Sequence, residues 1–342
     1  MNDIVRNAVS RLAELQSPSP TEVEASINAI LNGDVEPVLI SAFLMGLRMK
    51  GESVDDITAA ATVMRRHAHK LPAPADAVDT CGTGGLGWTT LNTSTASAIV
   101  AAAAGAKITK HGNRSVPPKT GSADVLEKLG VNLKTNNAQY QQCLDEAGVA
   151  FMFAQTHHSA MKNVAPVRKM LGLRTIFNLI GPLSNPAGAK RQVLGVFSKD
   201  WVEPLAEVLQ RLGTEKAWVV HGDDGLDELT VSSYSTVAEV TPQDITLSRI
   251  SPEDVGLRLH DVKSLAGGTP EFNAEAISNM LDGQPGAFRD IVALNAGAAL
   301  YVGDVSQTLE LGVQQCLEAI DNGQAKATLD CLIKCSNGNS RI

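Results

Sequence analysis

A glycine-rich loop near residue 80 carries residue types that suit an anionic ligand. The segment Cys81–Gly87 has glycine at four of its last six positions and follows a short β-branched run. Glycine lets the backbone approach a ligand closely. The polar run Asn92–Thr95 then opens an expected helix, whose first N–H groups favour an anion. The pattern predicts a phosphate-binding loop; the alternative is a purely structural turn.

Two common nucleotide motifs do not account for this loop. Gly82, Gly84 and Gly87 have the spacing of the dinucleotide fingerprint, but no acidic residue ends a second strand about 20 positions later. The P-loop pattern is also absent. A different anion site is therefore expected.

A second polar loop, Lys110–Ser115, follows a strand expected to end at Thr109. Its sequence, KHGNRS, places several donors around a glycine, which suits an anion at the carboxyl edge of an α/β sheet. A solvated surface loop is the alternative. Two donor-rich loops at one edge could together hold a ligand with two phosphate groups.

The elements that must position these loops follow from hydrophobic spacing. Residues 1 to about 70 read as four helices, and 71–75 reads as a linker. Strands are then expected at 78–81, 106–109, 149–153, 192–197 and 217–220, with helices between them. The last third is again helix-rich, at 271–282, 287–301, 307–322 and 325–335. This alternation predicts an α/β domain with a central, mostly parallel sheet behind a small all-α domain.

Composition limits the remaining possibilities. The 342 residues suit two domains, and the formal charge of −8 is unlike that of a general nucleic-acid binder. No apolar run is long enough to span a membrane, so we expect a cytoplasmic protein. The five cysteines are irregularly spaced. Cys331 and Cys335 lie four apart on an expected helix, but no second Cys/His pair accompanies them, so reduced thiols are expected rather than zinc.

Taken together, the motifs resemble the anthranilate phosphoribosyltransferase family over nearly the whole chain. The two loops are followed, in the order and at about the spacing of that family, by HSAM at 158–161, VR at 167–168, RTIFN at 174–178, GPLSNP at 181–186 and HGDDGLDE at 221–228. The resemblance implies a helical domain, 1–72, joined by a returning segment near 168–186. It also implies a catalytic α/β domain, 73–342, and a homodimer associating through the helical domain.

The resemblance also implies roles for individual residues. Phosphoribosyl pyrophosphate would bind at Gly82, Gly85, Leu86, Thr90, Asn92, Thr93, Ser94, Thr95, Lys110, His111, Gly112, Asn113, Arg114, Ser115, Pro118 and Ser122. Anthranilate would meet Gly82, Asn113, Arg168, His111, His158 and Pro182. Ser94, Asp227 and Glu228 would serve magnesium, with two Mg2+ ions per active site.

Elementary chemistry agrees with these roles. Magnesium with hydroxyl and carboxylate ligands neutralises a pyrophosphate leaving group. The planar fork of Arg168 can bind a carboxylate bidentately. Taken singly, Asp227–Glu228 could be an exposed acidic tip, Arg168 a helix-surface cation, and His111 and His158 packed imidazoles. No serine lies in a nucleophile elbow, so direct displacement at C1 of the ribose is expected.

The chain departs from the family pattern within the phosphate site. Leu86 stands where Asp is usual, Pro117-Pro118 where Ser-Ser is usual, and Thr120 where Ser is usual. Proline has neither an N–H nor a hydroxyl. These changes predict weaker donor binding. Ser159, in place of the usual proline after His158, is expected to matter less.

Other functions remain open from the sequence. A pyrimidine nucleoside phosphorylase shares this layout, although the Lys110–Ser115 and Gly225–Glu228 motifs favour the transferase. A non-catalytic relative that binds nucleic acid or another anion is a further alternative, against which the negative charge argues. A transferase acting on a modified anthranilate or another aromatic acid is the third. The aromatic amine of anthranilate is weakly basic and could attack without a protein base.

Overall fold

Four helices open the chain, as the spacing of its apolar residues predicts. The computed structural model describes residues 2–84, 87–115 and 120–338. The helices are α1 (Asn2–Ala13), α2 (Pro20–Asn32), α3 (Pro37–Lys50) and α4 (Val54–His67). The expected capping box forms at α2: Glu22 N donates to Ser19 Oγ at 3.2 Å, and Ser19 N donates to the Glu22 carboxylate at 2.8 Å.

A seven-stranded sheet forms the centre of the rest of the molecule. Its strands are β1 (Val78–Gly82), β2 (Ile108–Gly112), β3 (Val149–Phe153), β4 (Arg191–Gly195), β5 (Lys216–Gly222), β6 (Ser235–Val240) and β7 (Ile245–Ile250). The order across the sheet is β3-β2-β1-β4-β5-β6-β7. The first five strands in this order pair in parallel, and the β5–β6 and β6–β7 pairings are antiparallel. The mostly parallel sheet is confirmed.

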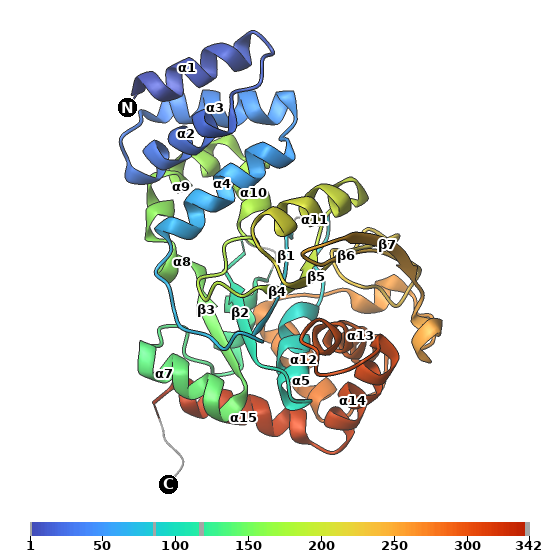
Figure 1. Cartoon of the computed structure of the whole chain (residues 1–342). Coiled ribbons are helices and arrows are strands. Elements are labelled where there is room, and N and C mark those ends of the chain that lie inside the picture. The colour runs from blue at the N-terminus through green and yellow to red at the C-terminus, as the bar shows by residue number, and fades with distance from the viewer. Residues whose placement is uncertain (1, 85–86, 116–119, 339–342) are drawn as a thin grey trace.

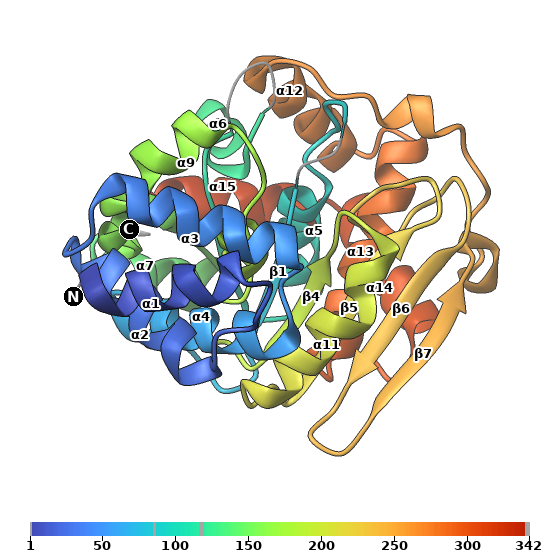
Figure 2. The same ribbon diagram turned by 90° about the horizontal axis from the view of Figure 1, so that it is seen from above.

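Two details of the sheet differ from the sequence predictions. Strand β2 begins at Ile108 and continues through Gly112, so Lys110 and His111 are buried strand residues and not part of a solvated loop. Parallel pairing with β3 carries the strand this far, with Lys110 opposite Phe151. The hairpin β6–β7 was not expected. It lies at the sheet edge away from the first helices (Figure 2).

Helices cover both faces of the sheet (Figure 1). After β1 and β2 come α5 (Thr93–Ala103), α6 (Ser122–Lys128), α7 (Asn137–Gln142) and the π-helical turn η1 (Cys143–Ala147). After β3 come α8 (Ala154–His157), η2 (Ser159–Asn163), α9 (Ala165–Leu171) and α10 (Ile176–Ile180). The rest are η3 (Lys199–Trp201), α11 (Val202–Arg211), η4 (Pro252–Val255), η5 (Val262–Leu265), α12 (Pro270–Leu281), α13 (Ala287–Val302), α14 (Leu309–Asp321) and α15 (Gln324–Ser336).

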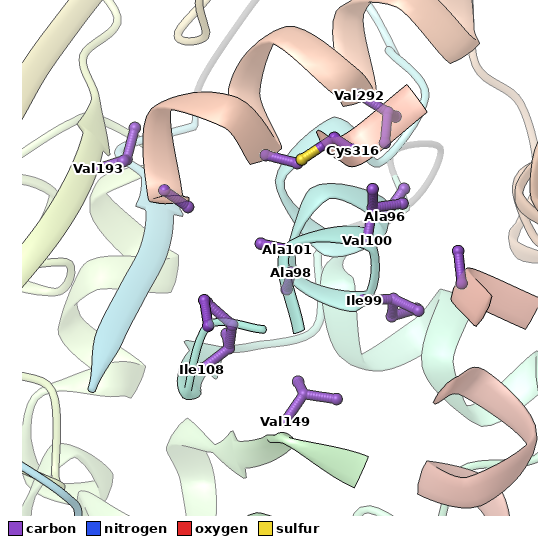
Figure 3. Packing of buried hydrophobic residues seen from close by; sticks show 14 of the residues in the cluster. Ala96, Ala98, Ile99, Val100, Ala101, Ile108, Val149, Val193, Val292 and Cys316 are labelled. Atoms are coloured by element: carbon purple, nitrogen blue, oxygen red, sulfur yellow. The ribbon is translucent and has the colours of Figure 1, made fainter. Parts of the chain in front are cut away.

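Alternate strand residues divide the core between the two faces, as the twofold period of a strand requires. Val193 packs with α5 and α13 in one cluster, together with Ile108 and Val149 (Figure 3). Its neighbour Leu194 packs in the other cluster, with α11, the first four helices, α9 and α10. Alanine-rich α5 and α13 make close contact on the first face. None of the described helices combines the length and apolarity that a bilayer span needs.

Candidate active site

A cleft opens at the carboxyl ends of β1 and β2. Residues 81–84, 88–95, 110–115, 120–122, Asp227 and Glu228 line it. The strand order reverses beside β1, because β2 and β3 lie on one side of it and β4 on the other. Ligands of open α/β sheets bind at such a switch point. Both polar loops therefore meet the acidic pair, as the sequence predicts.

Paired glycines let Asp227 cross this edge of the sheet. Gly82 at the end of β1 is opposite Gly195 at the end of β4. A Cβ added to Gly82 would lie 2.5 Å from Asp227 Oδ2, and one added to Gly195 would lie 1.6 Å from the Asp227 carbonyl oxygen. Gly84 N donates to Asp227 Oδ2 at 2.8 Å. The glycine loop thus fixes a carboxylate as well as leaving space for a ligand.

Glu228 lies at the amino end of α5. Ser94 N donates to Glu228 Oε1 at 3.2 Å. The Ser94 hydroxyl accepts from Lys110 Nζ at 3.3 Å, and Lys110 also donates to the Thr80 carbonyl. One hydroxyl, two carboxylates and one buried ammonium are therefore gathered at one end of the cleft. Burial lowers the pKa of Lys110, although the carboxyl of Asp79 opposes that shift.

Asp227 and Glu228 lie where burial disfavours their ionised forms. Burial raises the pKa of Asp227, and burial together with the charge of Asp227 raises the pKa of Glu228 to about 8. Two neighbouring buried carboxylates without a cation repel each other and resist ionisation. With Ser94 Oγ they offer only oxygen donors, the set that Mg2+ prefers. The residues present therefore fit a magnesium site.

A network of amides joins the two loops. Asn92 Nδ2 donates to the Thr120 carbonyl at 3.0 Å, and Asn273 Nδ2 donates to Asn92 Oδ1 at 2.8 Å. Asn273 also donates to the Thr90 carbonyl at 3.2 Å. Asn273 belongs to α12, far along the sequence, and no short motif pointed to it.

The second loop is organised by Asp124. Its Oδ2 accepts from Ser115 N at 3.1 Å and from Gly121 N at 3.0 Å. The Arg114 guanidinium, expected to face a phosphate, instead pairs with Asp124 at 2.9 Å and with Glu127 at 2.9 Å. Arg114 still lines the cleft, but its charge is already offset by two carboxylates. The G-x-x-D spacing of Gly121 and Asp124, a variant of the capping box, is the signal that could have indicated this arrangement.

Two imidazoles lie beside the cleft. The rings of His111 and His158 are 5.2 Å apart between centroids, in an edge-to-face arrangement. Burial lowers the pKa of His111 to about 3 and the pKa of His158 to about 4. Both rings are therefore neutral near pH 7. His111 Nε2 is buried and has no hydrogen-bond partner in the part of the chain that the structure describes.

The low pKa of His111 predicts an acid-dependent loss of stability. Its folded pKa lies below the usual 6.5, so its contribution is present above pH 6.5 and is lost as the pH falls toward 3. As the pH falls from 6.5 to 5, the free energy of unfolding should decrease in the wild type by about 2 kcal/mol more than in the His111→Asn variant. Urea titration at both pH values measures the two decreases. Exposed His69→Asn serves as the control. Equal losses for His111→Asn and the wild type would contradict the prediction.

The residues predicted to contact anthranilate are not all in the cleft. His158 is behind the lining residue His111, whose ring it contacts. Pro182 lies near the lining residue Cys81: its carbonyl accepts from Gln192 Nε2 at 2.8 Å, and the same nitrogen donates to Cys81 Sγ. Arg168 is on α9, where its guanidinium lies 5.7 Å from the centre of the Phe177 ring, and it is not among the lining residues. Burial lowers its pKa from the usual 12.5.

Some predicted positions fall outside the described residues, and some lining residues were not predicted. Gly85, Leu86, Pro117 and Pro118 lie outside the ranges 2–84, 87–115 and 120–338. Cys81, Thr83 and Gly84 line the cleft as parts of the predicted glycine loop, and Thr120 lines it as part of the second loop; the lining residues that sequence reasoning did not select include Trp88, Thr89, Leu91 and Gly121. Most of them adjoin a selected residue, so their place in the same two loops could have indicated them.

Comparison with known proteins defines the class. Residues 6–68 match the glycosyl transferase family helical bundle domain, and residues 74–326 match the glycosyl transferase family a/b domain. The anthranilate phosphoribosyltransferase of Hyphomonas neptunium is 50% identical over 97% of this chain and 97% of its own. That of Parvibaculum lavamentivorans is 50% identical over 98% of this chain and 99% of its own.

Solved structures point the same way. The anthranilate phosphoribosyltransferase of Thermus thermophilus superposes with a TM-score of 0.91 at 40% identity, covering 96% of this chain and 99% of the other. The Saccharomyces cerevisiae enzyme in complex with PRPP and Mg gives 0.90 at 25% identity, covering 99% of both. A second yeast structure, with 4-fluoroanthranilate, gives 0.89 at 25% identity, covering 99% of both. The chain belongs to the anthranilate phosphoribosyltransferase family of glycosyltransferases.

Proposed function

We propose that this chain transfers the phosphoribosyl group of phosphoribosyl pyrophosphate to the amine of anthranilate, giving N-(5-phosphoribosyl)anthranilate and pyrophosphate. The observation that carries the proposal is the single cleft that gathers Gly82, Ser94, Asn113, Asp227 and Glu228 at the carboxyl edge of the sheet. The relatives at 50% identity bear this name, and the yeast relative is described with PRPP and Mg. The reaction is a step of tryptophan synthesis.

Two magnesium ions per site are part of this proposal. Ser94 Oγ would serve one ion, and Asp227 and Glu228 would serve the second. The raised pKa values of both carboxyls support the assignment, because a bound cation offsets the cost of burying their negative charge. When bound, magnesium supplies positive charge that neutralises the departing pyrophosphate.

The side chains of the cleft act by position and charge. The amino end of α5 and the donors of residues 110–115 hold the phosphates, and the buried Lys110 adds positive charge at the same end. Pyrophosphate leaves C1 of the ribose as the anthranilate amine attacks from the opposite face. With a pKa of about 3, His111 is too weak a base to take the amine proton near pH 7. Its neutral ring can accept a hydrogen bond and so orient the acceptor.

Arg168 is proposed to bind the anthranilate carboxylate. For this, the acceptor has to lie between the cleft and α9, with Gly82, Asn113, His158 and Pro182 around it. Arg168→Lys should raise the KM for anthranilate at least about tenfold and leave the KM for the donor nearly unchanged, because lysine cannot bind bidentately. Steady-state kinetics with each substrate varied in turn measures both values. The neighbouring exposed residue supplies the control, Lys169→Ala, and equal effects of the two changes would contradict the assignment.

The departures at Leu86 and at Pro117-Pro118 predict a weakened donor site. At about 1–3 kcal/mol for each charged hydrogen bond lost, donor binding falls at least about tenfold relative to a chain with the usual residues. Leu86→Asp, and Pro117→Ser with Pro118→Ser, should therefore lower the KM for phosphoribosyl pyrophosphate. The KM for anthranilate is the internal control. An unchanged donor KM in both variants would reject this prediction.

The loss of anthranilate fluorescence tests the activity directly. The purified chain should consume anthranilate only when magnesium and phosphoribosyl pyrophosphate are both present. Cleavage of a pyrimidine nucleoside by inorganic phosphate, with no change in anthranilate, would favour the nucleoside phosphorylase instead. Absence of both reactions would leave an anion-binding relative. Turnover of substituted anthranilates in the same assay defines the acceptor.

The proposal extends to organisation and location. Helices α9 and α10 pack in the same apolar cluster as the first four helices, which supports a helical domain of 1–72 with a returning segment near 168–186 and an α/β domain of 73–342. Val38 and Met49 on α3 and Met170 on α9 are apolar and 73–89% exposed. These exposed apolar side chains support a homodimer through this unit, which analytical ultracentrifugation tests. A cytoplasmic enzyme fits free thiols such as Cys81.

A further inference from the structure

A cluster of soft and acidic ligands lies outside the active site. Cys331 and Cys335 project from α15 toward Glu146 in the π-helical turn η1, and one ligand atom from each of the three lies within 4.8 Å of the other two. Helix α15 packs along η1 and α7 (Figure 1). The turn ends where β3 begins, so the cluster is at the amino end of this strand, and the active-site cleft is at the carboxyl ends of its neighbours.

The thiol separation matches a tetrahedral metal site. Cys331 Sγ and Cys335 Sγ are 3.9 Å apart. Two thiolates bound to zinc at about 2.3 Å with tetrahedral angles are about 3.8 Å apart. A disulfide needs about 2.05 Å between the sulfurs. The fold therefore holds the pair at the distance that a shared metal ion requires and well beyond a covalent bond.

The Glu146 carboxylate is already oriented. Gln142 Nε2 donates to Glu146 Oε1 at 2.8 Å, which leaves the other oxygen available as a ligand. Metal-binding carboxylates are commonly held by such outer hydrogen bonds. The neighbouring Asp145 has a similar bond from Gln141, at 2.9 Å, but is not part of the cluster. The π-helical turn shifts the side-chain register locally, a geometry frequent at functional sites.

We propose that Cys331, Cys335 and Glu146 bind a zinc ion that fastens helix α15 to the turn before β3. The ion takes two thiolates, one carboxylate oxygen and one water in the fourth position. The third ligand, which the sequence spacing did not indicate, comes from a different element, distant in the chain.

Charge and access fit this site. Two thiolates and one carboxylate around a divalent ion leave a net charge of −1. The positive Lys107 lies beside η1, where its Nζ donates to the Leu144 carbonyl at 3.2 Å. Cys331, Glu146 and Lys107 line one surface depression, which provides an entry path and room for the water ligand. Metal binding must release the thiol protons, so affinity should rise with pH.

Cobalt provides the direct probe. The full-length protein, reduced and freed of metal by a chelator, is titrated with Co2+ in the presence of excess Mg2+. One equivalent per chain should produce thiolate-to-cobalt charge-transfer bands in the near ultraviolet and the visible bands of a tetrahedral ion. One equivalent of Zn2+ should then abolish both. Zinc should also raise the Tm of the protein by mass action, and a chelator should reverse the rise.

Variants distinguish this site from other binding. Cys331 is partly buried. The Cys331→Ser variant should lose the charge-transfer bands and the zinc-dependent rise in Tm, yet keep its far-ultraviolet circular dichroism and its transferase activity. Glu146→Gln should weaken cobalt binding at least about tenfold. Asp145→Asn and Cys143→Ser are the matched controls and should bind as the wild type does.

Three results would overturn the proposal. The first is a reduced wild-type protein without thiolate bands. The second is a Cys331→Ser protein that keeps them, which would place the ion elsewhere. The third is loss of binding in Asp145→Asn or in folded Cys143→Ser, which would reject this ligand set.

Discussion

Replacing Asp227 and Glu228 together by their amides should lower magnesium-dependent kcat/KM by at least about a thousandfold, which is about 4 kcal/mol of transition-state stabilisation. The amides keep the acceptors that bind Gly84 N and Ser94 N, so the local geometry is preserved. Only the negative charge is removed. On the proposed assignment, the site without this charge loses the magnesium that would neutralise the leaving pyrophosphate.

Stability should change in the opposite direction. Burial raises the pKa of both carboxyls, so in metal-free protein their ionisation opposes folding at neutral pH. The amide variant should therefore have a Tm at least equal to that of metal-free wild type. Magnesium should raise the Tm of the wild type and leave that of the variant unchanged. Differential scanning calorimetry measures both effects.

A nearby acidic residue controls for general charge effects. Asp223 precedes the pair in the same turn and forms an ion pair with Arg249 at the surface. Asp223→Asn should keep both activity and the response to magnesium. A double amide variant that retained magnesium-dependent turnover would show that the metal is held elsewhere.

Much of the architecture could be predicted because local signals agreed with the fold. The capping box at Ser19 and Glu22 forms as its spacing requires, and the Asn92–Thr95 stretch does open a helix. The two polar loops and the Asp227–Glu228 pair meet because parallel strands place their carboxyl ends at one edge. These features depend on short segments and on one topological rule.

The remaining features depend on contacts between distant segments. Lys110 is buried within β2 because β3 pairs alongside it, and no local pattern distinguishes that from a solvated loop. Arg114 pairs with Asp124 and Glu127, and these carboxylates compete with a phosphate for its guanidinium. The residue type of Arg114 alone does not indicate this pairing. The third ligand of the cysteine pair comes from η1. Burial and pairing decide the role of a charged residue, and both follow only from the fold.

Gly195→Ala should reduce activity although Gly195 is not among the residues that line the cleft. It is the last residue of β4, and its backbone is outside the left-handed region, so alanine brings no backbone strain of its own. The added Cβ would, however, lie 1.6 Å from the Asp227 carbonyl oxygen and 2.5 Å from its carbonyl carbon. Backbone cannot rotate away as a flexible side chain can, so the turn that carries Asp227 and Glu228 has to move.

The expected result is a shift in magnesium dependence with the fold retained. A displacement of about 1 Å at a reacting centre can cost about a hundredfold in rate, so kcat/KM should fall by about that factor at fixed magnesium. The magnesium concentration for half-maximal activity should rise. Gly181→Ala is the matched control, because its added Cβ would meet only the Phe177 carbonyl oxygen, at an ordinary 3.7 Å. A normal magnesium response in Gly195→Ala would contradict the prediction.

Combining the two changes isolates the cause. If Gly195→Ala acts only by displacing the acidic pair, it should cost little further activity in a chain that already carries Asp227→Asn and Glu228→Gln. Residues that act through one site give strongly non-additive effects, whereas independent sites add. A combined loss equal to the product of the two separate losses would mean that Gly195 supports the reaction by another route. If the combined variant is no less active than the double amide variant, Gly195 acts by leaving space for Asp227 at the end of β4.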